Sequence, residues 1–232
     1  MKKLNIALVR LGNLKHSVNL NNIEKWKSDL FSISHISTID LFENAKGDYW
    51  VYTDKQLVEK YNNDTDADFT IGIINGKLSD NYYMRRLTNN FAVISIYEMA
   101  EIIFSANYTI EGYLIRNIYE LLVLFKSNRS LFPEDSHTWA HDDIRGCLFD
   151  MNADKFDILF SMDKPKLCAH CKAKVMASNV DTEFLSKLDN EVKRIKKSMY
   201  FRIAGFIHTH PILSAIIAAT TAISINISSN FL

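Results

Sequence analysis

The sequence predicts an α/β domain in which helices flank a mixed β-sheet. Two observations lead to this fold class. Short apolar runs of strand length recur along the amino-terminal half, and longer stretches with helical spacing lie between and after them. The chain has 232 residues, more than the about 100 to 150 of a typical domain, so we expect one large domain and an appendage.

Four apolar runs are predicted strands. They are Leu4 to Leu11, Tyr49 to Thr53, Phe69 to Ile74 and Phe91 to Ile96. The first ends at a Gly12-Asn13 turn and the third at Asn75-Gly76, a tight-turn signature. After the first turn the apolar residues recur at helical spacing instead, which predicts a helix that carries Ile23, Trp26, Leu30 and Phe31.

Two helices are predicted after the last strand, over 97–106 and 109–125. Thr109 is the expected N-cap of the second, with Glu111 in its first turn. The apolar side chains of this helix form a broad stripe that we expect to be buried. Arg116 and Glu120 stand four residues apart, and we expect them to pair on the solvent side of the helix.

The charge balance excludes one class of partner. Acidic and basic residues are equal in number, 27 each, so the formal net charge is zero. Nucleic-acid binding draws on a basic surface, and no nucleic-acid partner is expected. The apolar run at the amino end is too short for a signal peptide and is broken by Arg10. These features fit a protein made in the reducing cytoplasm.

The three cysteines of the chain predict a zinc site. Cys168 and Cys171 form a Cys-x-x-Cys pair, Cys147 lies about twenty residues earlier, and His141 precedes Cys147 by six positions. Two thiolates on a turn and a third from another segment can hold Zn²⁺ if a fourth ligand is near. The candidates for that ligand are His141, His137, Asp142 and His170, of which we favour His141 or Asp142. Two alternatives remain, namely buried reduced thiols and, more weakly, a redox pair.

The order of these pieces resembles the archaemetzincins, zinc metalloproteases of the metzincin type. In that family a helix with His-Glu-x-x-His comes first and a third histidine follows it. That histidine is followed by a cysteine, by a second cysteine after four intervening residues, by a methionine and by a late Cys-x-x-Cys. Here His141-Asp142 stands where the family has His-Cys, and Cys147, Met151 and the Cys168 pair follow in order. The resemblance covers about 69–175. It implies a structural zinc site and a metallopeptidase-like fold.

The chain departs from the family where catalysis would take place. Imidazoles four residues apart on a helix hold the catalytic metal, and the glutamate between them activates the metal-bound water. This chain has Tyr119 and Val123 at those two positions. The resemblance therefore carries over only Glu120, as a general base, and His141, as the third histidine. Asp142 replaces the first structural cysteine.

The carboxyl end differs in composition from the rest of the chain. We expect a basic connecting helix over 181–202, and residues 203–232 contain no Asp, Glu, Lys or Arg. That run is long enough to cross a hydrocarbon core, which takes about 20 helical residues, and Pro211 is expected near its start. The basic flank before it predicts that the body faces the cytoplasm.

The uncharged run has a second interpretation, as a buried or partner-binding helix in a cytoplasmic protein. Its Ser, Thr and Asn residues favour this alternative, because unpaired polar groups are costly in lipid. Small residues could also join two copies of the chain into a homo-oligomer. They are Ala215, Ala218, Ala219 and Ala222.

Three function classes follow. The first is a non-catalytic, metallopeptidase-like zinc protein that comprises 1–180 with a zinc knuckle over 141–171. It is tethered to the cytoplasmic face of a membrane by 203–232, and its role is to bind or regulate a protein or peptide. The second is a zinc-dependent peptidase of atypical ligand set that uses Glu120 and His141. The third is a membrane effector whose α/β domain acts as a sensor.

Overall fold

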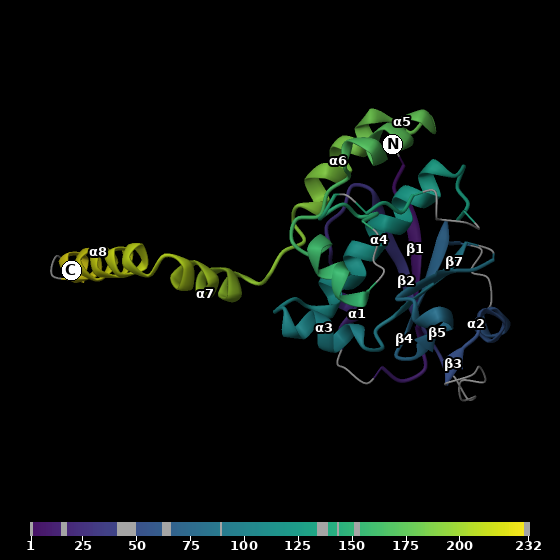
Figure 1. The fold of residues 1–232 in the computed structure, drawn as a ribbon, viewed down its shortest axis with the longest axis horizontal. Helices are drawn as coiled ribbons and strands as arrows, with labels where there is room; N and C mark the ends of the chain where they lie inside the picture. Colours follow the sequence, from purple (N-terminus) through teal and green to yellow (C-terminus); the bar gives the residue numbers. More distant parts are fainter. Residues whose placement is uncertain are drawn as a thin grey trace. The chain divides into compact units, whose positions relative to one another are not determined.

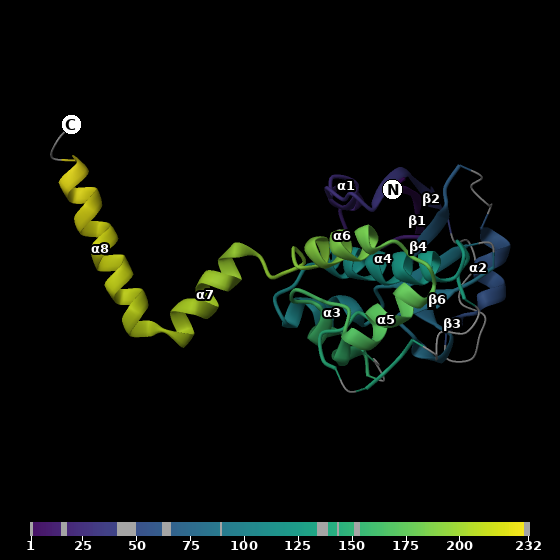
Figure 2. The ribbon, with the colours of Figure 1, turned by 90° about the horizontal axis from the view of Figure 1, so that it is seen from above.

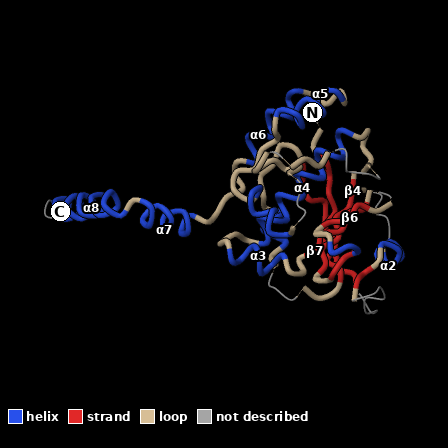
Figure 3. Tube along the Cα trace, in the orientation of Figure 1, coloured by secondary structure: helices blue, strands red, loops and turns tan. Residues whose placement is uncertain are grey.

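The main sheet of the computed structural model has five strands, which run through the centre of the body (Figures 1 and 3). They are β1 (Leu4–Leu11), β2 (Phe31–Ile39), β4 (Phe69–Ile74), β6 (Met84–Arg86) and β7 (Phe91–Ser95). Their spatial order is β2-β1-β4-β7-β6, and all neighbours are parallel except β6, which runs antiparallel to β7 at the edge. Strands β3 (Val51–Tyr52) and β5 (Lys77–Leu78) pair separately. The predicted mixed sheet is confirmed.

The structure describes residues 2–14, 18–40, 50–61, 66–88, 90–133, 139–142, 144–150 and 154–229. For residues 226–229 it describes the backbone alone. The helices are α1 (Leu20–Glu24), α2 (Asp54–Lys60), α3 (Met99–Ser105), α4 (Ile110–Ser127), α5 (Ala169–Ala177), α6 (Thr182–Val192), α7 (Met199–Thr209) and α8 (Pro211–Ser229). Two short 3-10 helices are η1 (Ser79–Asn81) and η2 (Lys155–Ser161).

Helices cover both faces of the sheet, because its strands alternate in the direction of their buried side chains. Leu8 and Ile71 belong to the larger core, which is shared with α1, α3, α4 and α6. Val9 and Val93 belong to the smaller core, which Leu57 of α2 closes. In Figure 2 the long helix α4 lies between α6 on one side and α3 and α5 on the other. The flanking helices predicted from the sequence are thus present.

The helix expected to include Ile23, Trp26, Leu30 and Phe31 is largely absent. Only α1 forms, and Phe31 begins strand β2. Ser28 causes the change of direction, because its Oγ accepts hydrogen bonds from the backbone N–H groups of Leu30 (3.0 Å) and Phe31 (3.2 Å). The residues that follow are rich in Ile, Ser and Thr, of which the β-branched ones suit a strand.

Helix α4 begins where the sequence predicts, but it has no solvent-exposed face. Thr109 caps it by accepting a hydrogen bond from Gly112 N at 3.0 Å. Arg116 is 0% exposed and Glu120 is 6% exposed, so the expected solvent-facing pair is buried. The reason is that segments distant in sequence cover this face, among them Leu148 and Ser161, which both contact the guanidinium of Arg116.

The basic helix expected over 181–202 is interrupted. Helix α6 packs against α4 and ends at Val192, and α7 begins only at Met199. Between them the Ile195 side chain enters the core, and the Ile195 carbonyl accepts a hydrogen bond from Lys164 N at 2.7 Å. Burial of Ile195 therefore replaces the next helical turn.

The chain divides into two compact units, Met1–Lys196 and Lys197–Leu232. In the second unit, α7 and α8 meet at His210, whose φ of −132° and ψ of 61° are not helical. Pro211 accounts for this break, because a proline disfavours helical geometry at the preceding residue. Among the described residues no single helix is sufficiently long and apolar to cross a membrane. Met199–Thr209 and Pro211–Ile225 together have the length and apolar composition of a span, but the two helices are bent by 114°.

Candidate metal centre

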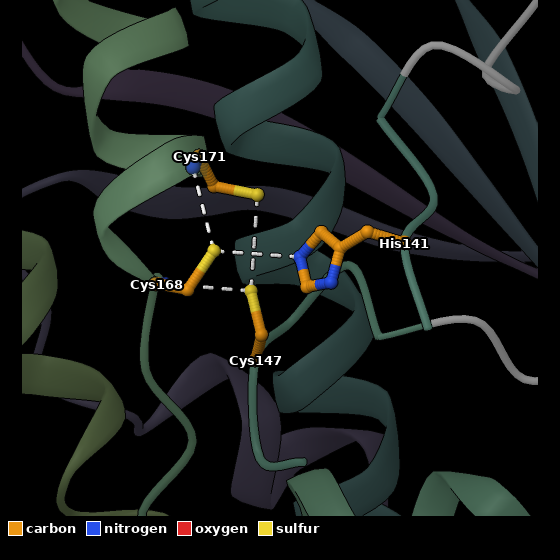
Figure 4. A group of neighbouring side chains, drawn as sticks. All are labelled: His141, Cys147, Cys168 and Cys171. Carbon is orange, nitrogen blue, oxygen red and sulfur yellow. Dashed lines mark hydrogen bonds between the residues drawn. The ribbon is translucent and has the colours of Figure 1, made fainter. Parts of the chain in front are cut away.

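The amino end of helix α5 places two cysteines next to each other. Cys168 is the N-cap residue, and its Sγ accepts a hydrogen bond from Cys171 N at 3.4 Å. Because Cys171 lies one turn into the helix, both sulfur atoms face the same space (Figure 4). The positive end of the helix dipole favours thiolates at this position.

The loop before η2 supplies the third cysteine. Gly146 has a φ of 87°, a left-handed conformation that suits glycine, and it turns the chain so that Cys147 points to the same space. The loop is fixed by hydrogen bonds between Lys166 N and Gly146 O (2.9 Å) and between Leu148 N and Lys166 O (2.9 Å). Lys166 stands two residues before Cys168, so this pairing brings the two cysteine segments together.

His141 completes the group. Its backbone N–H donates to Phe149 O at 3.2 Å, and an isolated parallel bridge joins His141 to Asp150. The imidazole Nε2 lies 3.5 Å from Cys168 Sγ, and Cys147 Sγ lies 3.8 Å from Cys171 Sγ. All four ligand atoms lie within 4.8 Å of one another. The three cysteines are buried and free of disulfides.

These distances fit one tetrahedral zinc ion. Zinc–sulfur bonds of about 2.3 Å and a zinc–nitrogen bond of about 2.0 Å imply sulfur–sulfur separations of about 3.8 Å and sulfur–nitrogen separations of about 3.5 Å. The separations of 3.8 Å and 3.5 Å match these values. Three Cys and one His form a donor set typical of structural zinc. The chain therefore has a cluster that can bind zinc, as the cysteine pattern predicts.

Hydrogen bonding within the cluster prepares a thiolate. The Sγ atoms of Cys147 and Cys171 share a hydrogen bond, and this interaction lowers the pKa of Cys147 and raises the pKa of Cys171. The backbone N–H of Cys168 also donates to Cys147 Sγ, at 3.4 Å. The thiolate is the form that binds a metal, so Cys147 is the ligand best prepared for it.

The other candidate ligands lie outside this group. Asp142 is exposed, and the ligand atoms that come together do not include its carboxylate. His170 is exposed on α5, with its ring centroid 6.5 Å from that of His141. His137 and Met151 are outside the described residues. Trp139 packs on Phe149, with ring centroids 4.8 Å apart, in a packing role.

Glu120 is held by a network inside the body. Its carboxylate accepts a hydrogen bond from the guanidinium of Arg116 and longer ones from Tyr83 Oη at 3.3 and 3.4 Å. Burial lowers the pKa of Arg116, but the charge of Glu120, the nearby Tyr83 and the hydrogen bonds to both together outweigh this effect, and the pKa is raised. Arg116 also donates to Leu148 O at 2.6 Å, which connects α4 to the cysteine loop.

The positions that would carry helix histidines are occupied by packed side chains. Val123 is in the core, and Tyr119 Oη donates to Glu191 Oε2 at 2.6 Å and accepts from Trp26 Nε1 at 2.8 Å. Glu191 also accepts from Ser28 Oγ at 2.5 Å. Sequence reasoning missed this polar cluster, because its members are far apart in the chain and only their burial makes them notable.

A surface groove of about 570 Å³ is lined by residues of η1, α3 and η2 and by Tyr82 and Tyr83, which directly precede the edge strand β6. Four carboxylates line it, together with Tyr82, Tyr83 and Phe156; these carboxylates belong to Asp80, Glu98, Glu101 and Asp154. Lys155 enters the groove and donates to Asn81 Oδ1 at 2.9 Å and to Glu98 Oε2 at 3.1 Å. The groove is thus acidic and aromatic, a chemistry that suits basic side chains.

Comparisons with known proteins give one structural likeness. No protein-family model matches the chain, and no curated protein matches its sequence. The fold is similar to the crystal structure of archaemetzincin from Methanopyrus kandleri, with 16% sequence identity and a TM-score of 0.49 over 76% of this chain and 96% of that one. The resemblance predicted from the sequence is confirmed as a loose structural similarity.

Proposed function

We propose that this chain is a non-catalytic, metallopeptidase-like zinc protein that binds one structural zinc ion. The observation that supports the proposal most is the position of His141. By resemblance this residue would be a ligand of a catalytic metal, but it lies with Cys147, Cys168 and Cys171 in one group. Four protein ligands close a tetrahedral site and leave no position for a water or a substrate.

Helix α4 supports the same conclusion. Tyr119 is hydrogen-bonded to Glu191 and Val123 is packed in the core, so neither can bind a metal. Glu120 is paired with the buried Arg116 instead of facing a metal-bound water. In the described part of the chain, the His141 group is the one set of three or more His, Cys, Asp or Glu side chains placed to hold a metal ion.

Metal analysis of the purified full-length chain tests this proposal. We expect one equivalent of zinc, lost in Cys171→Ser, and a lower unfolding midpoint in that variant, because binding energy at such a site is also folding energy. His170→Ala is the matched control, since His170 is exposed on the same helix and outside the group. It should keep both the zinc and the midpoint.

Two outcomes would contradict the proposal in different ways. Wild-type protein without zinc, and Cys171→Ser unfolding at the same midpoint, would leave three buried thiols with no metal role. Two equivalents of zinc with chelator-sensitive peptide cleavage by the wild-type chain would favour the alternative, an atypical peptidase.

The proposed role is binding or regulation at a membrane. Apolar side chains of α7 and α8 are exposed, for example Ile212 at 77% and Met199 at 74%. Such a surface needs a lipid or protein environment. Lys193, Arg194 and Lys196 precede it, and basic residues of this kind favour the cytoplasmic face. The acidic groove beside β6 is the surface that suits a basic peptide partner. Self-association through the alanines of α8 remains a prediction.

A further inference from the structure

Two buried polar groups next to the metal centre lack hydrogen-bond partners. One is Nδ1 of His141, and the other is the carboxylate of Asp150, of which neither oxygen has a partner. The side chain of Asp150 is 1% exposed. The backbone bridge between His141 and Asp150 sets the two residues side by side. A buried polar group without a partner is costly, so a pair of them on neighbouring residues calls for an explanation.

The chemistry of zinc binding explains why these two groups lack partners. Nε2 of His141 faces the cysteines, so its lone pair must be free for the metal and the ring proton must then lie on Nδ1. That N–H needs an acceptor. Metal-bound histidines almost always donate their second ring N–H to a carboxylate, a carbonyl or a water. Among the described residues, Asp150 is the one with a buried carboxylate that lacks a hydrogen-bond partner, and the bridge pairs it with His141.

We propose that Asp150 accepts the Nδ1–H of His141 and so positions this imidazole for the zinc ion. The inference rests on the zinc site proposed above and adds a residue to it. Asp150 acts through His141 and is a positioning residue. Asp142, the alternative fourth ligand expected from the sequence, is exposed and outside the group.

Arg145 leaves room for this bond. Its Nη1 lies 3.5 Å from one oxygen of Asp150 and 3.7 Å from Asp157, and its guanidinium stacks over the Phe160 ring at 4.4 Å. The arginine side chain is half exposed, and its contact with Asp150 lacks hydrogen-bond geometry. Three thiolates and Zn²⁺ carry one net negative charge, to which Asp150 adds another. Arg145 offsets part of this charge and does not occupy both oxygens.

Zinc affinity, measured by competition with a chromophoric chelator on the full-length chain, tests the role of Asp150. We expect Asp150→Ala to weaken zinc binding by about 10- to 100-fold. Asp150→Asn should weaken zinc binding less, because an amide oxygen can still accept a hydrogen bond from the Nδ1–H of His141. Asp142→Asn removes the same charge one residue from His141 and is the matched control, expected to stay within about twofold of wild type.

A double-mutant cycle separates positioning from a general effect on folding. In His141→Cys the fourth ligand has no ring N–H, so Asp150→Ala should then change zinc affinity by less than about threefold. Nitrogen NMR of the zinc-loaded wild type should show His141 protonated at Nδ1, with that resonance shifted in Asp150→Asn. This second measurement does not require Asp150→Ala or His141→Cys to fold.

The outcomes are distinct. Equal loss of affinity in both backgrounds, or a His141 Nδ1 resonance unmoved by Asp150→Asn, would overturn the role of Asp150 while the zinc site stands. A wild-type chain that binds no zinc would instead overturn the proposed function itself.

Discussion

Glu120 and Arg116 form an ion pair that is cut off from water on helix α4. Because the guanidinium is fully buried, removing its partner leaves an uncompensated charge in the core. We expect Glu120→Gln to lower the free energy of unfolding by about 3 to 5 kcal/mol, measured by chemical denaturation. An exposed pair at the same spacing would contribute only about 0.3 to 0.5 kcal/mol.

Lys55 and Glu59 provide the matched control on helix α2. They are also four residues apart and lie at 3.9 Å, but both side chains are exposed. Glu59→Gln should change the free energy of unfolding by less than about 0.5 kcal/mol. If Glu120→Gln were equally mild, the Arg116 charge would have to be reached by water, and the description of α4 as buried on all sides would be wrong.

The sequence predicts which of these side chains meet but not where they lie. Spacing of four residues on a helix makes Arg116 and Glu120 neighbours whatever surrounds them. Their burial depends on Leu148 in the cysteine loop and on Ser161 at the end of η2, which lie 32 and 45 residues after Arg116. For the same reason, clustering of cysteines predicts a metal site, whereas the choice between His141 and Asp142 depends on a turn that spacing alone does not determine.

Contact between helices α4 and α6 is held by a polar cluster inside an apolar interface. Tyr119 on α4 donates to Glu191 on α6, which also accepts from Ser28 before β2. Tyr119→Phe keeps the ring and removes one donor to a buried carboxylate. We therefore expect the free energy of unfolding to fall by about 1 to 3 kcal/mol.

Tyr82→Phe, on an exposed ring, should have little effect on the same measurement. Zinc content should stay the same in both variants, because neither tyrosine belongs to the metal group. A Tyr119→Phe protein as stable as wild type would show that Glu191 finds a replacement donor, for example a water, and that this cluster does not hold α6 in place.

At the same scale, the strands show where sequence patterns are sufficient. Strands β1, β4 and β7 lie inside the sheet and are apolar on both faces, so continuous apolar runs predict them. Strand β2 was missed because its first residue also fits the helical spacing of Ile23 and Trp26. Strand β6 is three residues long and includes Arg85 and Arg86, and only its pairing with β7 makes it a strand.

The two units of the whole molecule differ in how far they bury their apolar side chains. In Met1–Lys196 these side chains form two cores, whereas in Lys197–Leu232 many stay exposed. Composition predicted this difference, since 203–232 has no charged side chain. It did not predict the break at His210, which follows from the local effect of Pro211 on backbone geometry.

Removal of the second unit tests the membrane proposal. A chain that ends at Lys196 keeps both cores and all four metal ligands, so it should stay in solution, fold and retain one zinc ion. The full-length chain should sediment with phospholipid vesicles. It should also resist extraction by alkaline carbonate, because a helix held in lipid by burial of its apolar side chains does not depend on charge for its attachment. Ile216→Arg with Ile217→Arg keeps the length of α8 but places charges in its apolar stretch, each costly in lipid by about 2.5 to 3.5 kcal/mol, and should abolish sedimentation. If the full-length chain instead stays in the supernatant and the shortened chain unfolds, the second unit is part of the folded protein core and the proposed membrane attachment is wrong.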